Sequence, residues 1–591
     1  MCGIAGEIRF DGKKASVERV AFMTRHMHLR GPDASGIIAR DNVVLGHRRL
    51  KIIDLSEKGQ QPMTDPSLGL SLVFNGCIYN HKEIRSILEK MGYKFFSDSD
   101  TEVILKSYHA WGEHCVDKFN GMFVFAIHER DSGKIFLARD RLGIKPLYYY
   151  KSPGVLRFAS SLPALVKSMQ IKPDIDQVAL HYYMTFHSVV PAPRTIFASI
   201  SKIPPGMTYT FDKTGMYKER RYWEICFSDK MTNSGFDNED TIIETLLDKL
   251  RLSARRRTEA DVPVGVLLSG GVDSSMVVSL LAEIGYPDLK TFSVGFEDTA
   301  EESGNEFKYS DLVAKKFGTD HYRINVDSSQ IIQNLPGCLN AMSEPMVSHD
   351  NIGFYLLGKH VSEHVKVVQS GQGADELFGG YYWYQRLHES KNPVNDYADA
   401  FFDRHHEEFK TAVTDQYTNA DFSRAFVTDH FALAGANDPV DKALRLDTTV
   451  MLTDDPVKRV DNMTMAWGLE ARVPFLDHEV VEYAATIPAR LKLKNGGKYI
   501  LKEAARRILP EVVIDRPKGY FPVPVLKYLR GPMLEYVKSA LSNQAARERN
   551  IFRQDYLKKL IDDPVAHITP LKGSKLWQAA TLELWMQTHG I

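Results

Sequence analysis

Residues 264–275 combine small, hydroxylic and acidic side chains in a pattern that could bind phosphate. The apolar run Val264-Gly-Val-Leu-Leu268 passes into Ser269-Gly-Gly-Val-Asp-Ser-Ser275, and a second apolar run follows. We interpret this as a buried strand, a glycine turn and the start of a helix. Gly270 and Gly271 would allow close backbone approach, and the first free N–H groups of the helix would face the same ligand. Such a turn is typical of anion-binding sites.

An acid distinguishes this turn from the common nucleotide-binding loop. A Walker loop requires Gly-x-x-x-x-Gly-Lys-Ser/Thr, whereas this turn has no lysine and carries Asp273. An acid among phosphates implies a bridging Mg²⁺ ion. The alternative is a tight strand-to-helix turn rich in small residues, and the turn by itself does not decide between the two.

Cys2 is a candidate nucleophile because removal of Met1 would leave a thiol and a free α-amine on one residue. The amine has an ordinary pKa of about 7.7 to 8.0 and the thiol one of ~8.5, so the amine can accept the thiol proton near neutral pH. The alternative is an incidental cysteine at the second position.

Polar, turn-rich clusters in the first hundred residues could complete such a site. Asn75-Gly76 could supply a side-chain amide and a backbone N–H to a tetrahedral oxyanion, while Arg49 and Asp100 could hold a substrate carboxylate and ammonium group. The alternative is a hairpin turn at Asn75-Gly76 and a surface charge at Arg49.

The elements that would position these residues differ between the two ends of the chain. The first quarter alternates helices with short strand-like runs, which predicts packed antiparallel sheets flanked by helices. The strands are expected near 43–47, 70–74, 122–127, 135–139 and 147–150, and the helices near 17–27, 82–90 and 102–111.

Proline-rich and polar segments up to residue 240 mark a domain boundary, after which a helix is expected at 241–255. The strand runs 262–268, 291–296 and 365–369 are separated by helical patterns, which predicts a parallel doubly wound sheet. Residues 396–434 are expected to be helical and peripheral, with His405-His-Glu-Glu408 on a polar helix surface.

Composition narrows the class of protein. A chain of 591 residues predicts two or more domains, and a net charge of -1 gives no general attraction to nucleic acid or anionic membranes. No apolar run reaches the ~20 residues that span a bilayer. Five scattered cysteines without Cys-x-x-Cys spacing indicate neither a disulfide framework nor a zinc site, which fits a cytoplasmic protein.

The amino-terminal motifs carry a resemblance. Met1-Cys-Gly-Ile-Ala-Gly6, Arg30-Gly-Pro-Asp33 and Phe74-Asn-Gly-Cys-Ile-Tyr-Asn80 resemble the glutaminase domain of class II amidotransferases. The resemblance implies that Cys2 attacks the glutamine carboxamide and releases ammonia, that Asn75 and Gly76 form the oxyanion hole, and that Arg49, Asn75 and Asp100 bind glutamine. Cys77 stands where relatives usually carry an acid, which leaves Asp100 to hold the glutamine amine alone.

The carboxy-terminal motifs extend the resemblance over nearly the whole chain. Ser269 to Ser275 matches the pyrophosphatase loop of adenylating ligases, and Ser370-Gly-Gln-Gly-Ala-Asp-Glu-Leu-Phe-Gly-Gly-Tyr381 repeats the strand-and-glycine-turn pattern. Together with the glutaminase motifs they are similar to the asparagine synthetase B family. The resemblance implies an α+β N-terminal-nucleophile sandwich at 1–215, a linker at 216–240 and an α/β doubly wound parallel-sheet synthetase domain at 241–591.

The resemblance also implies the synthetase site. ATP would be bound by Leu268, Ser269, Gly271, Asp273, Ser275, Val294 and Gly371, and Mg²⁺ by Asp273 and Asp375. Lys498 would neutralise phosphate charge as an acyl carboxylate displaces pyrophosphate.

The sequence says less about which acceptor is amidated than about the reaction. Asparagine synthetases usually carry Glu where this chain has Gln372, and a neutral amide cannot take a proton. With the stretches 180–193 and 342–350, this makes the chain most similar to the N-acetylglutaminylglutamine amidotransferases, which make a neutral osmolyte. The alternatives are aspartate as acceptor, a free-standing glutaminase, and a non-catalytic storage or regulatory relative; a homodimer is compatible with each.

Overall fold

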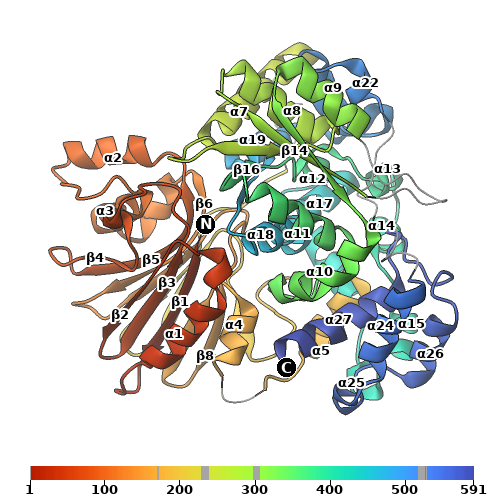
Figure 1. The fold of residues 1–591 in the computed structure, drawn as a ribbon, viewed down its shortest axis with the longest axis horizontal. Coiled ribbons are helices and arrows are strands. Elements are labelled where there is room, and N and C mark those ends of the chain that lie inside the picture. The colour runs from red at the N-terminus through yellow and green to blue at the C-terminus, as the bar shows by residue number, and fades with distance from the viewer. Residues whose placement is uncertain are drawn as a thin grey trace.

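The computed structural model describes residues 2–169, 172–227, 238–296, 307–516, 523, 526 and 529–591. A β-sandwich occupies one side of the molecule and a mixed α/β part the other, with a helical carboxy-terminal region beside it (Figure 1). The amino terminus lies between the sandwich and the α/β part (Figure 1).

Two antiparallel six-stranded sheets form the sandwich. The first has the order β10 (Ile200–Lys202), β8 (Tyr148–Ser152), β9 (Val155–Ala159), β1 (Gly3–Arg9), β3 (Val43–Arg49) and β2 (Ala34–Arg40). The second has the order β12 (Tyr217–Arg221), β11 (Met207–Phe211), β7 (Ile135–Arg139), β6 (Gly121–Glu129), β5 (Leu70–Ile78) and β4 (Met63–Asp65).

Side chains that alternate along β6 pack into two different hydrophobic cores. Val124 and Ala126 pack between the two sheets, whereas Phe123 and Phe125 pack in the core on the opposite face. That outer face is covered by α2 (His81–Lys90) and α3 (Asp100–Trp111), and the first sheet is covered by α1 (Val17–His26) and α4 (Leu162–Lys167). Helices on both outer faces bury the strand ends that later form the site.

The second part contains a five-stranded sheet in which every pair is parallel. Its order is β15 (Asp320–Val326), β14 (Lys290–Phe296), β13 (Val264–Leu267), β16 (Val367–Gln369) and β17 (Glu470–Arg472). The helices that connect or cover these strands are α7 (Glu239–Arg256), α8 (Val272–Glu283), α9 (Phe307–Phe317), α10 (Ser328–Ala341), α11 (Asp350–Val361), α12 (Ala374–Phe378) and α18 (Lys458–Met465). The predicted fold class, a sandwich followed by a parallel sheet, is confirmed.

The remaining helices lie around the parallel sheet and beside it. They are α5 (Gln177–Thr185), α13 (Tyr382–Leu387), α14 (Pro393–Phe401), α15 (His406–Ala412), α16 (Phe422–Ala432), α17 (Pro439–Leu446), α19 (His478–Thr486), α20 (Ala489–Leu493), α21 (Tyr499–Arg506), α22 (Glu511–Ile514), α24 (Gly531–Ser542), α25 (Gln544–Arg549), α26 (Gln554–Asp562) and α27 (Lys575–His589), with two π-helical segments at Asp447–Met451 and Thr453–Val457. Of these, α19 and α21 pack against α7, and α22 packs against α8.

The helical prediction for 396–434 is confirmed by α14, α15 and α16. One side of these helices is buried, because the rings of Tyr397, Phe401 and Phe409 pack against Phe431, Trp383 and His181 on other helices. Glu408 also forms an ion pair, since its carboxylate lies 2.6 Å from Lys575 Nζ.

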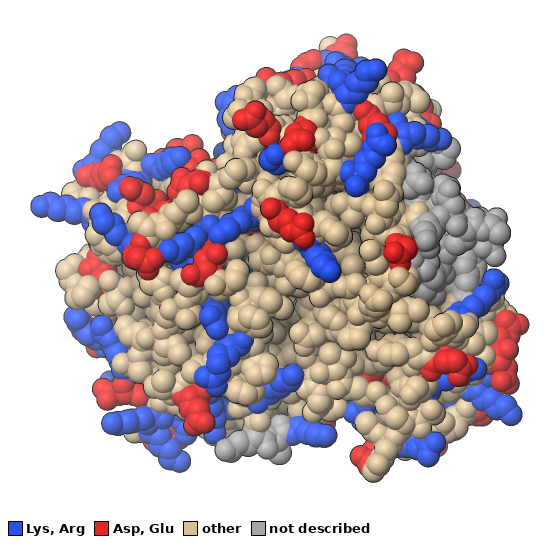
Figure 2. All heavy atoms as spheres, viewed as in Figure 1, with Lys and Arg blue, Asp and Glu red and all other residues tan. Residues whose placement is uncertain are grey.

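On the face shown in Figure 2, positive and negative side chains are interspersed. Among the described residues, the helices include none that is long and apolar enough to cross a membrane.

Candidate functional site

Cys2 lies buried at the start of β1, at the wall of a pocket between the sandwich and β17. Its backbone nitrogen donates a hydrogen bond to Asn75 Oδ1 at 3.0 Å. Burial raises the pKa of the Cys2 thiol, so the thiol needs a base close by if it is to act as a nucleophile. The amine that would supply this base requires removal of Met1, which lies outside the described residues.

Asn75 and Gly76 lie within β5, paired with β6, so the hairpin-turn alternative is wrong. Asn75 Nδ2 is buried and has no hydrogen-bond partner among the described residues. An unpaired buried amide costs about 1–3 kcal/mol. Asn75 itself does not line the pocket, but its neighbours Phe74 and Gly76 do. A side chain at position 76 would place its Cβ 2.1 Å from the carbonyl oxygen of Met122, which requires glycine.

Arg49 is not a surface charge, because its side chain is buried at the end of β3. Its guanidinium donates to the carbonyl oxygens of Ser56 at 2.9 Å and of Asp54. Asp100, the first residue of α3, accepts from the Ile78 N–H at 3.0 Å, and burial raises its pKa. Both side chains line the same pocket as Cys2, as the sequence predicts.

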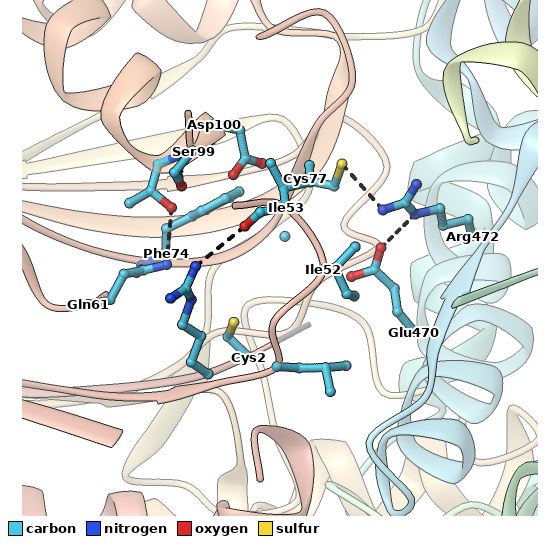
Figure 3. Close-up of a pocket in the computed structure, with 14 residues that line it drawn as sticks. Cys2, Ile52, Ile53, Gln61, Phe74, Cys77, Ser99, Asp100, Glu470 and Arg472 are labelled. Carbon is cyan, nitrogen blue, oxygen red and sulfur yellow. Dashed lines mark hydrogen bonds and ion pairs between the residues drawn. The ribbon is translucent and has the colours of Figure 1, made fainter. Parts of the chain in front are cut away.

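Glu470 and Arg472 enter this pocket from β17 of the parallel sheet (Figure 3). Arg472 Nε donates to Glu470 Oε1 at 2.6 Å, and Arg472 Nη2 donates to Cys77 Sγ at 3.6 Å. The position that carries an acid in relatives therefore faces a buried cation here. The sequence reasoning missed both residues as pocket residues; their spacing of two on a strand predicts a shared face, but not which pocket that face meets.

A second cleft lies where β13 and β16 end. Leu268, Ser269, Gly271, Asp273, Val294 and Gly371 line it, together with Asp375 and Lys498. Gly270 has φ +74°, and a Cβ there would lie 2.6 Å from the Ser310 backbone nitrogen. The expected strand, glycine turn and helix start are therefore present, as β13, 268–271 and α8.

Lys498 joins the two glycine loops. Its Nζ lies 2.7 Å from Asp273 Oδ2 and 2.8 Å from Asp375 Oδ1. Burial lowers the pKa of this ammonium, but the two carboxylates outweigh burial and hold the pKa above its usual value. The structure thus brings together two acids and one cation that stand far apart in the sequence.

Ser275 is the one predicted ATP-binding residue that does not line the cleft. Its Oγ is fully buried in α8 without a hydrogen-bond partner among the described residues, and Ser274 lines the cleft in its place. The helical register explains the difference, because successive residues at a helix start project in different directions.

Gln372 lines the same cleft, beside Asp350 and Arg459. The Arg459 guanidinium lies 3.6 Å from Asp350 and 3.5 Å from Asp455, so two carboxylates already neutralise it. Arg459 belongs to α18, which packs against α11.

A buried ionic cluster lies between the sandwich and the α/β part. Lys202 Nζ of β10 contacts Glu344 at 2.9 Å and Asp454 at 2.6 Å, while Lys458 Nζ contacts Glu344 at 3.2 Å. Tyr148 of β8 donates to Glu344 Oε2 at 3.3 Å. Side chains from both parts are needed to satisfy these charges, so the cluster fixes how the two parts meet.

Comparisons with known proteins also divide the chain into an amino-terminal and a carboxy-terminal part. Residues 245–587 match the asparagine synthase family model, and residues 1–223 match the glutamine amidotransferase domain model. Asparagine synthetase [glutamine-hydrolyzing] 1 of Bacillus subtilis is 32% identical over 99% of this chain and 96% of its own. Asparagine synthetase B of Escherichia coli is 29% identical (88% and 82% covered), and amidase chyE of Penicillium rubens is 26% identical (92% and 92%).

Proposed function

The chain belongs to the asparagine synthase family, and we propose that it transfers ammonia from glutamine to the terminal carboxylate of N-acetylglutaminylglutamine. It is a glutamine-hydrolysing ligase of the amidotransferase type, and the family uses ATP as co-substrate. The acceptor, the metal and the residue roles below are the proposed part.

In the first step, the Cys2 thiolate attacks the glutamine carboxamide carbon, and ammonia leaves as the thioester forms. The proton of the thiol passes to the α-amine that Met1 removal exposes and then to the leaving nitrogen. Asn75 Nδ2 and the Gly76 N–H would stabilise the oxyanion, while Arg49 and Asp100 bind the carboxylate and amine of glutamine. Water then hydrolyses the thioester to glutamate.

In the second step, the acceptor carboxylate attacks the α-phosphate of ATP and pyrophosphate leaves; ammonia then displaces AMP from the acyl-adenylate. The observation that supports this half is the convergence of Asp273, Asp375 and Lys498 on one cleft. We assign Leu268, Ser269, Gly271, Ser275, Val294 and Gly371 to ATP, with Ser275 acting through the loop rather than by contact. Lys498 would neutralise charge on the phosphates.

Mg²⁺ fits the donor set of this cleft. Asp273 and Asp375 offer carboxylate oxygens, the ligands that Mg²⁺ prefers, and both lie within 2.8 Å of the same Nζ. When bound, the ion would neutralise part of the charge on the phosphates.

Gln372 supports an acceptor other than aspartate, because it cannot take a proton where asparagine synthetases usually carry Glu. Arg459 adds to this argument. Aspartate has a second carboxylate that would need a cation, but Asp350 and Asp455 already neutralise Arg459. Aspartate remains the alternative acceptor, and the printed names of the synthetase relatives favour it.

The test is to incubate the purified protein with ATP, glutamine and either aspartate or N-acetylglutaminylglutamine and to identify the amide by mass spectrometry. The blocked dipeptide amide is expected; asparagine as the sole product would overturn the proposed acceptor. Cys2→Ala should lose glutaminase activity and keep synthesis from added ammonium. A non-catalytic relative would show neither activity before or after the substitution.

We further propose domains at 1–215 and 241–591 joined by a linker at 216–240, with strand β12 extending the second sheet past residue 215. Residues 228–237 of that linker lie outside the described residues. A cytoplasmic location and a possible homodimer complete the proposal.

A further inference from the structure

Three potential metal ligands meet where α5 packs against α15 and α16, away from both pockets described above. His181 Nε2 of α5 lies 3.1 Å from His406 Nδ1 of α15 and 3.9 Å from Asp421 Oδ1, at the start of α16. All three ligand atoms lie within 4.8 Å of one another. The residues stand in separate elements, so their convergence arises from the tertiary fold.

Hydroxyl groups behind His181 hold the orientation of its ring. His181 Nδ1 lies 3.1 Å from Ser423 Oγ and 3.2 Å from Thr185 Oγ1. Thr185 donates its own hydroxyl proton to the His181 carbonyl oxygen at 2.7 Å, so its oxygen is free to accept from Nδ1–H. Ser423 Oγ also lies 2.6 Å from Thr185 Oγ1. With the proton on Nδ1, the Nε2 lone pair would face His406 and Asp421. This is the outer-contact arrangement that supports metal-bound histidines.

The surroundings suit a neutral imidazole beside a carboxylate. His181 is fully buried between the rings of Phe409 and Phe422, and burial lowers its pKa to about 4. Asp421 Oδ2 lies 3.4 Å from Arg424 Nε, while Oδ1 also caps α16 by accepting the Arg424 N–H. One carboxylate and two imidazole nitrogens form a donor set that suits a divalent transition-metal ion.

The distances are close to those of a tetrahedral site. Zinc bonds of about 2.0–2.1 Å at tetrahedral angles place neighbouring ligand atoms about 3.4 Å apart. The pair His181 and His406 is already at 3.1 Å, whereas Asp421 Oδ1, 3.9 Å from His181 Nε2, would have to move closer to reach the ion. The Asp421 side chain is 29% exposed. Its exposed side leaves room for a water molecule as fourth ligand.

We propose that His181 Nε2, His406 Nδ1 and Asp421 Oδ1 bind one divalent transition-metal ion of the zinc class, with water as fourth ligand. Two nitrogens and one carboxylate oxygen without thiolate favour zinc, cobalt or nickel over the hard cation Mg²⁺. The ion would fasten α5, which lies between β9 and β10 of the sandwich in sequence, to α15 and α16. The competing interpretation is a plain hydrogen bond from His406 Nδ1–H to His181 Nε2.

The experiment uses the full chain, stripped with a chelator and titrated with Zn²⁺, Co²⁺ or Mg²⁺. His406→Gln and Asp421→Asn remove one ligand each from partly exposed positions, and asparagine keeps the helix cap. His405→Gln is the matched control, because His405 is the neighbouring exposed histidine and pairs only with Asp399 among the described acids, at 3.3 Å. Metal bound at the Cys2 thiol or the ATP cleft stays constant across the three variants.

Wild type and His405→Gln should bind one more equivalent of Zn²⁺ than His406→Gln, show the visible d–d bands of tetrahedral Co²⁺, and gain thermal stability with Zn²⁺ but not with Mg²⁺. Asp421→Asn should bind at least tenfold more weakly. Equal stoichiometry in all variants would overturn the proposal. So would a loss of stability in His406→Gln that is the same with and without metal, since the hydrogen-bond interpretation requires that result.

Discussion

Replacing Asn75 with alanine tests whether its unpaired amide serves catalysis. The side chain makes one described hydrogen bond, in which Oδ1 accepts from the Cys2 nitrogen at 3.0 Å, while Nδ2 is buried without a partner. If Nδ2 is the oxyanion donor, its loss acts on the transition state of glutamine attack and leaves glutamine binding little changed.

The expected loss follows from the oxyanion role. Removing one such donor costs about 10²–10³ in kcat, or about 2.7–4 kcal/mol of transition-state stabilisation. Stability should change far less. The variant gives up one hydrogen bond of about 1 kcal/mol, and it also removes an unsatisfied buried donor that costs about 1–3 kcal/mol.

The assay is glutamate release from glutamine, measured beside AMP formation with ammonium as nitrogen source. Asn75→Ala should lose the first activity and keep the second within about twofold, as expected for independent sites. The matched control is Asn120→Ala, a buried amide whose Nδ2 is paired with Asp477 at 3.3 Å. It should lose stability and keep its glutaminase rate. Glutaminase activity within about fivefold of wild type in Asn75→Ala would refute the oxyanion assignment.

Three further predictions follow from buried charges. Lys498→Ala should lower ammonium-dependent AMP formation by at least about 100-fold, because Asp273 and Asp375 lose their shared cation, with glutamate release unchanged; near-normal AMP formation would contradict this. Asp461→Asn should raise the glutamate formed per AMP, because Asp461 binds Arg30 at 3.0 Å and Arg30 holds the Cys2 carbonyl oxygen at 3.3 Å; an unchanged ratio would remove Asp461 from coupling. Burial lowers the pKa of Lys492 to about 8, whereas the pKa of a lysine in the unfolded chain is ~10.4. The charged Lys492 therefore destabilises the fold at neutral pH, and this destabilisation is lost as the pH rises from about 8 to ~10.4. Lys492→Met should therefore be more stable at pH 7 by up to about 3 kcal/mol, a gain that disappears near pH 10.5, whereas the exposed Lys494→Met should show no such gain in denaturant titrations.

The sequence predicted elements and motifs whose signals are local. Alternation and glycine turns predict β3, β5, β7 and β13 to within a few residues, and the two glycine loops line one cleft. Each of these inferences depends on neighbours along the chain.

Contacts between distant segments were not predictable in the same way. Arg472 reaches Cys77 across nearly 400 positions, and His181 meets His406 across more than 200. No periodicity encodes such pairs, because they depend on how whole elements pack. The polar helix start at 405–408 shows the same limit: His405 and Glu407 are exposed as predicted, whereas the ion pair of Glu408 with Lys575 depends on another helix that packs against it.

The two halves of the chemistry meet on one helix. The Cys2 carbonyl oxygen accepts from Arg30, Arg30 pairs with Asp461 of α18, and the same helix carries Arg459 into the ATP cleft. Lys458, also on α18, binds Glu344 beside Lys202 of the sandwich. Buried ion pairs of this kind add little net stability, but removing one partner leaves an uncompensated charge. A change at either pocket that displaces α18 is therefore expected to disturb charges that face the other pocket.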